Sequence, residues 1–183
     1  MEDENVFHSF SKSDMYNLPD TNSLSKTELY NLLKEQTRAL VAEEFDFIAN
    51  TANLSSLLWH SLPQINWVGL YRLQLKELVL GPFQGKPACV RIPVGKGVCG
   101  TAVKENRSIL VPDVRQFPGH IACDAESRSE LVVPLRASED LILGVLDIDS
   151  PIENRFDEID RMGIEAIAEI LTSHVSRLIK ATS

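Results

Sequence analysis

This sequence of 183 residues has no long apolar run, no excess of positive charge and few cysteines. No stretch approaches the roughly 18 apolar residues that a membrane-spanning helix needs. Acidic residues outnumber basic ones by 26 to 18, which argues against nucleic acid or an anionic membrane as a partner. What remains is the composition of a globular domain, with 44% hydrophobic and 24% charged residues.

A secretory signal is also missing, because the amino terminus MEDEN has neither a basic region nor an apolar core. The expected location is therefore the cytoplasm, where cysteines rest as thiols. The chain has three cysteines, and an odd number fits poorly with a structural disulfide framework. Burial or chemistry should explain them instead.

The chain divides into two parts of different character. Residues 1–22 are acidic and polar, which predicts a flexible N-terminal arm. Residues 23–183 have the size of a single domain. Its first helix should begin near Ser25, which forms a capping-box pattern with Glu28. A second helix is expected over 44–61.

The last helix is the clearest element, because apolar residues recur at helical spacing from Phe156 to Ile179 and include Ile159 and Met162. Between the helices lie six segments rich in branched and aromatic residues, expected as strands over 65–73, 77–83, 89–94, 108–113, 129–137 and 141–149. A short helix opening at Gly100 interrupts them.

The short turns between strands predict an α+β fold with a central, mostly antiparallel, six-stranded sheet. The N- and C-terminal helices should cover one face of this sheet. The segment 95–128 should cross the other face and roof a pocket.

Alternation of side chains along the strands predicts which residues face that pocket. If the more aliphatic side of each strand faces the terminal helices, the other side collects two aromatic rings, a thiol and three carboxyl groups. These are Trp67, Tyr71, Cys89, Glu130, Asp147 and Asp149. An aromatic wall with a few convergent polar groups is typical of a small-molecule site.

Carboxyl groups crowded in such a pocket would have raised pKa values, and one could act as a general acid. A plainer alternative stays open. Asp147 and Asp149 could simply end a strand and cap the turn at 150–151. Glu130 could equally be a solvated charge at the edge of a strand.

The cysteines also leave alternatives. Cys99 could be a small buried residue, or a thiol whose pKa is lowered by the start of a helix. Cys123 lies in a polar loop and is a poor candidate for the core. Three thiols could bind zinc, but there is no C-x-x-C pair. The glycines around Cys99 lack the Lys-Ser/Thr ending of a phosphate-binding loop.

These residues nevertheless form a recognisable set. The matching segments, besides the three cysteines, are INWVGLY (65–71), PVGKGVCGTA (93–102), SELVVPL (129–135) and GVLDIDS (144–150). Together they closely resemble the free methionine-(R)-sulfoxide reductases, which are single GAF-domain enzymes. The similarity runs from about residue 25 to 180, and the cysteine trio separates this group from other GAF domains.

The resemblance implies thiol-dependent reduction of free L-methionine (R)-sulfoxide, as a defence against oxidative stress. Cys123 would attack the sulfoxide sulfur and become a sulfenic acid. Cys89 would then form a disulfide with Cys123, and Cys99 would substitute or relay. Thioredoxin would restore the thiols by exchange.

The resemblance also implies roles in binding. Glu130 and Asp149 would deliver protons, and Asp147 would bind the substrate ammonium. The rings of Trp67 and Tyr71 would wall the methyl-sulfoxide end. Backbone amides at Gly97 and Gly100 would receive the substrate carboxylate.

No metal or other cofactor is implied, and both a monomer and a homodimer are compatible with the sequence. Two other classes of function stay open at this point. One is a non-catalytic GAF sensor of a small ligand such as a nucleotide. The other is a zinc-binding structural protein.

Overall fold

The computed structural model describes residues 21, 23–119, 124–139 and 141–181, with side chains up to residue 173. Its centre is a six-stranded sheet in the order β3-β2-β1-β6-β5-β4, and every neighbouring pair is antiparallel. The strands are β1 (Trp67–Gln74), β2 (Glu77–Gly85), β3 (Arg91–Pro93), β4 (Ile109–Val111), β5 (Ser129–Ser138) and β6 (Leu141–Ser150). The predicted α+β architecture is confirmed.

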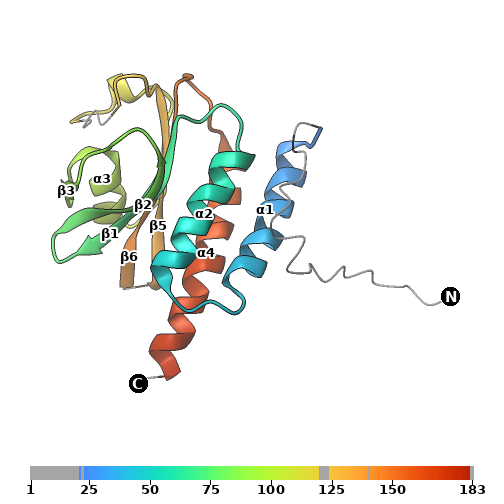
Figure 1. Ribbon diagram of the computed structural model, residues 1–183. Helices are drawn as coiled ribbons and strands as arrows, with labels where there is room; N and C mark the ends of the chain where they lie inside the picture. The colour runs from blue at the N-terminus through green and yellow to red at the C-terminus, as the bar shows by residue number, and fades with distance from the viewer. Residues whose placement is uncertain (1–20, 22, 120–123, 140, 182–183) are drawn as a thin grey trace.

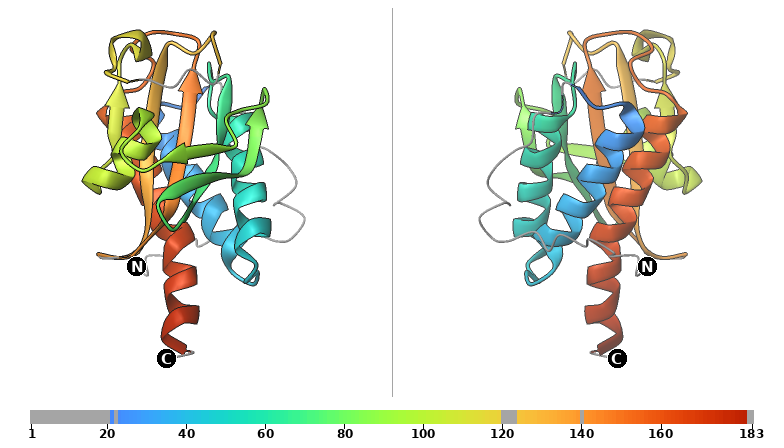
Figure 2. Two further views of the ribbon diagram at one scale, coloured as in Figure 1. Left: turned by 90° about the vertical axis from the view of Figure 1, so that its left-hand side faces the viewer. Right: turned by 90° about the vertical axis from the view of Figure 1, so that its right-hand side faces the viewer.

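Three helices lie on one side of the sheet, as Figure 1 shows. They are α1 (Lys26–Val41), α2 (Phe47–Ser61) and α4 (Glu158–Ala181). α2 and α4 pack against the sheet, and α1 packs on α2 and α4. Figure 2 shows α1 between α2 and α4. α1 begins as predicted, because the Ser25 hydroxyl accepts from the Glu28 amide and the Glu28 carboxylate accepts from the Ser25 amide. None of the helices in the described residues is long and apolar enough to cross a membrane.

The other face carries α3 (Gly97–Glu105) and the short 3-10 helix η2 (Val114–Gln116). The two faces hold separate apolar clusters, one under the three long helices and one under α3. The sheet is therefore the middle layer of the domain, and α3 lies over the face on which the pocket was predicted.

The predicted apolar stripe of α4 needs one correction. Ile159 and Met162 were expected to face the core, but they are 46% and 62% exposed. The buried stripe instead begins at Ile164 and continues through Ile167 and Leu171. Near the start of α4 the buried position is Asp160, which accepts from the Tyr30 hydroxyl and from Arg155. A polar cluster therefore replaces apolar packing there.

Candidate active site

Three central strands place the predicted pocket residues on one face. Trp67 of β1 is opposite Asp149 of β6, which is in turn opposite Glu130 of β5. Asp147 and Tyr71 lie on the same side of the sheet and line the same cavity. The cavity has about 530 Å³ of space free of atoms, including its open mouth. The predicted alternation is confirmed for these five residues.

An aromatic stack forms one wall of this cavity. The ring of Trp67 lies 5.9 Å from that of Tyr71 and 5.4 Å from that of Phe83, centre to centre. The Trp67 indole N–H donates to the carbonyl of Lys86, and the Tyr71 hydroxyl donates to the carbonyl of Cys89, each at 3.0 Å. Both rings are thereby fixed, and the segment that carries Cys89 is held against the cavity.

Glu130 and Asp147 are buried and Asp149 is partly buried, and desolvation raises the pKa of all three carboxyl groups. Burial raises the pKa of Asp147 only to about 6, because hydrogen bonds from Cys99 and Glu130 stabilise its charged form and oppose the rise. For Glu130 and Asp149 the neighbouring negative charge adds to burial and raises the pKa well above its usual range. At neutral pH Asp147 thus carries the charge and Glu130 donates a proton to it.

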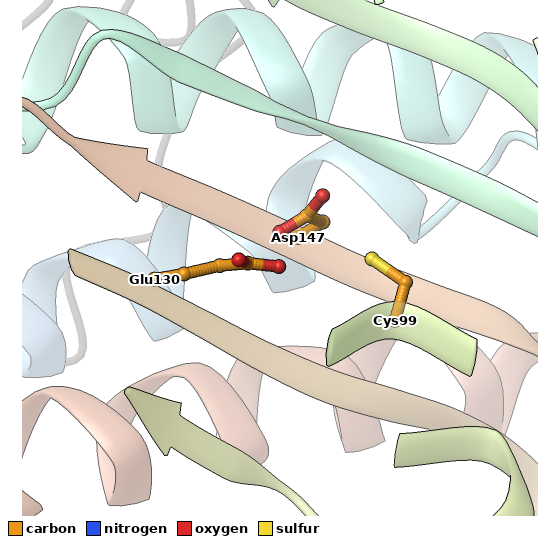
Figure 3. Close-up of side chains that lie close together, drawn as sticks. All are labelled: Cys99, Glu130 and Asp147. Atoms are coloured by element: carbon orange, nitrogen blue, oxygen red, sulfur yellow. The ribbon is translucent and has the colours of Figure 1, made fainter. Parts of the chain in front are cut away.

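Cys99 completes this group from α3. Its sulfur and one oxygen each of Glu130 and Asp147 all lie within 4.8 Å of one another (Figure 3). The thiol is free and buried, and burial and the adjacent carboxylates raise its pKa well above the usual range. The alternative of a thiol activated by the start of a helix is therefore wrong for Cys99.

The predicted strand over 89–94 begins only at Arg91, so Cys89 lies in the loop before it. The predicted facing in this segment is wrong. Alternation with Cys89 towards the pocket would turn Val90 and Ile92 towards the long helices, but Ile92 lines the pocket and Val90 is 64% exposed. Cys89 still packs against the pocket-side cluster and is disulfide-bonded. Cys123, the predicted nucleophile, lies outside the described residues.

The two predicted glycines differ in their surroundings. Gly97 begins α3 with a φ of 60° and lines the cavity, three residues before the predicted start of this helix. The prediction that the Gly100 amide receives the substrate carboxylate is wrong, because this amide already donates to the carbonyl of Lys96. A Cβ at position 100 would lie 2.4 Å from the Pro93 carbonyl oxygen, so this glycine allows close packing.

The structure adds residues that the sequence analysis missed. Asp124, Ser127 and Lys86 line the cavity. Lys86 pairs with Asp124 at 3.5 Å and with Glu126 at 2.7 Å, and Ser127 hydrogen-bonds with the Asp149 carboxylate. No sequence pattern indicated them, since they lie in loops that only the fold brings to the strands.

Comparisons with known proteins agree with this fold and site. The model of the GAF domain matches residues 39–175. The free methionine-R-sulfoxide reductase of Escherichia coli is 53% identical over 144 residues, covering 79% of this chain and 87% of that protein.

Two solved structures are similar over almost their full lengths. The reduced form of fRMsr of Staphylococcus aureus is 57% identical, with a TM-score of 0.77, over 80% of this chain and 94% of that chain. The free methionine-R-sulfoxide reductase from Neisseria meningitidis in complex with its substrate is 42% identical, with a TM-score of 0.81, over 86% and 95%. The chain therefore belongs to the GAF domain family and, within it, to the group of the free methionine-R-sulfoxide reductases.

Proposed function

We propose that this protein reduces free L-methionine (R)-sulfoxide to L-methionine. The observation that carries the proposal is the trio of carboxyl groups that line the pocket, two of them buried, beside an aromatic wall and the segment of Cys89. The identity of 53% to a relative named for this reaction supports it. A protonated carboxyl group can supply the proton that the departing sulfoxide oxygen requires.

The proposed nucleophile is Cys123. Its thiolate attacks the sulfoxide sulfur while a carboxylic acid protonates the oxygen. The oxygen passes to Cys123, which is oxidised to a sulfenic acid, and methionine leaves with its sulfur reduced by two electrons.

The proposed resolving thiol is Cys89. It attacks the sulfenic sulfur of Cys123, which releases water and forms a disulfide, and a dithiol such as reduced thioredoxin restores both thiols. The disulfide-bonded state of Cys89 supports this assignment, as does the free, buried thiol of Cys99. Because its pKa is raised, Cys99 is poorly suited to relay the disulfide, and we assign it the hydrogen bond to Asp147.

The carboxyl groups divide the remaining work. Glu130 keeps its proton more readily than Asp147 and is the proposed acid, with Asp149 as its support. Asp147 holds its negative charge near neutral pH and is the proposed partner of the substrate ammonium. The rings of Trp67 and Tyr71 then contact the methyl-sulfoxide end.

The substrate carboxylate is assigned to the first turn of α3. The amides of Gly97, Val98 and Cys99 precede the first residue that bonds within the helix, and Lys96 provides no side-chain cap. All three residues line the cavity. The start of this nine-residue helix thus presents amides and a partial positive charge to the anion.

The test is a stereospecific assay with each sulfoxide epimer of free methionine, in which oxidation of thioredoxin is followed. We expect turnover with the R epimer, and none with the S epimer or with Cys123→Ser. Equal turnover of both epimers, or full activity in Cys123→Ser, would contradict the proposal. A methionine sulfoxide peptide is the matched control for the requirement of a free amino acid.

A further inference from the structure

The cluster of Cys99, Glu130 and Asp147 contains a thiol beside two carboxyl groups, and proton transfer requires only the carboxyl groups. The three side chains come from α3, β5 and β6 and converge on one point, as Figure 3 shows. Each is buried, and each lines the cavity of the candidate active site. One sulfur and two carboxyl oxygens are thus gathered from three separate elements.

A second observation concerns Asp147. Its side chain is 6% exposed, and its Oδ1 atom is buried with no hydrogen-bond partner within the part of the chain that the structure describes. A buried carboxylate oxygen without a partner is costly, and such atoms call for an explanation, an ion among them. This atom needs a cationic or hydrogen-bonding ligand from outside the described residues.

We propose that Cys99, Glu130 and Asp147 form a binding site for a thiophilic divalent cation of the zinc class. Thiolate and carboxylate are both zinc ligands, at about 2.3 and 2.0–2.2 Å, so tetrahedral ligand atoms lie roughly 3.5 Å apart. The three ligand atoms lie within 4.8 Å of one another, so the side chains need to approach by at most about 1.3 Å to bind the ion. The sulfur favours zinc over magnesium or calcium, which prefer oxygen ligands.

Binding of the cation has a chemical consequence. The thiol of Cys99 and the carboxyl group of Glu130 each lose their proton to solvent, and both become anionic ligands. The cation then occupies the place that the proposed function gives to the substrate ammonium beside Asp147. Zinc is therefore a competitive inhibitor, and this consequence rests on the proposed function, whereas the binding itself does not.

The binding test uses the full chain with Cys89→Ser and Cys123→Ser, which leaves Cys99 as the sole thiol. We expect calorimetry to find about one zinc ion per chain and cobalt to give a sulfur-to-metal charge-transfer band in the near ultraviolet. Adding Cys99→Ser should abolish the band. Adding Glu130→Gln or Asp147→Asn should weaken zinc binding by roughly tenfold or more, because each removes a ligand.

The matched control is Glu77→Gln, which changes a half-exposed glutamate on β2 that pairs with Arg91. It should leave zinc affinity unchanged. Cobalt bound without the sulfur band, or zinc bound equally after Cys99→Ser, would overturn the proposal. Binding with the band but without reductase turnover in the zinc-free wild type would instead refute the proposed function. Competitive inhibition of that turnover by zinc supports both.

Discussion

The two faces of the central sheet use the same strands for opposite purposes. In β5, Leu131 faces the long helices and is 0% exposed, whereas its neighbour Glu130 faces the pocket and is 5% exposed. In β6, Ile148 and Asp147 repeat this contrast. One face buries aliphatic side chains, and the other buries acids a residue away.

The difference shows how the domain tolerates a destabilising site. Burial of ionisable groups costs free energy, whereas burial of a leucine or isoleucine contributes about 1.5–3 kcal/mol. Since the strands are shared, the helix-side cluster also fixes the positions of the acids. Stability and chemistry should therefore respond to different substitutions, even at adjacent residues.

The largest expected effect is on catalysis. Glu130→Gln keeps the shape and neutrality of the protonated side chain but removes the proton, so kcat should fall by about 10²–10⁴-fold. Thermal unfolding should remain near that of the wild type, because no charge becomes buried. Retention of kcat within a few-fold would show that the acid lies elsewhere.

The next change is on the opposite face of the same strand. Leu131→Ala leaves a cavity in the helix-side cluster, so the free energy of unfolding should fall by about 2–5 kcal/mol in denaturant titrations. Activity per folded molecule should stay close to normal. An equally large loss of kcat would mean that the two faces are not separable.

A smaller effect concerns pH. The pKa of Asp147 is raised to about 6 in the folded state from an ordinary value of 3.8, so the folded protein binds more protons between these values. Its contribution to stability is therefore greatest below pH 4 and declines as the pH rises through about 6. In Asp147→Asn the free energy of unfolding should therefore fall by about 1–3 kcal/mol less over this pH range than in the wild type.

The measurement is the difference in unfolding free energy between wild type and Asp147→Asn from pH 4 to 7.5. This difference cancels acids elsewhere, such as Asp113, whose pKa is lowered by Arg115. A difference that does not vary with pH would contradict the burial of a charged Asp147.

The smallest effect is expected for an acid outside both clusters. Glu77 pairs with Arg91 at the surface of β2 and β3, and such exposed pairs contribute little. Glu77→Gln should change stability by less than about 0.5 kcal/mol and leave kcat unchanged. A loss comparable to that of Glu130→Gln would mean that burial is not what distinguishes the pocket acids.

The contrast between the faces was predictable where strands are central. β1 and β6 have partners on both sides and β5 is paired along its length, so strict alternation holds for Trp67, Glu130 and Asp149. The same rule failed just after Cys89, for Val90 and Ile92. β3 is a three-residue strand at the edge of the sheet, and pairing begins only at Arg91.

The start of α1 was predictable from its capping box, whereas α2, capped by Asp46, begins at Phe47 and not at the expected residue 44. Ser25 and Glu28 determine the start of α1, whereas α3 starts at Gly97 with no side-chain cap and so lacked a signal. The loop residues Asp124 and Ser127 could not be assigned to the pocket, because tertiary contacts alone bring them there. The finding that Cys99 belongs with the acids likewise required the packing of α3 on the sheet.

The most direct test of the central claim is a single-turnover experiment with fully reduced protein, free methionine (R)-sulfoxide and no added reductant. We expect about one methionine per chain, with the loss of two thiols and retention of the one at Cys99. If no methionine forms and all three cysteines still titrate as thiols, the pocket does not perform this reduction.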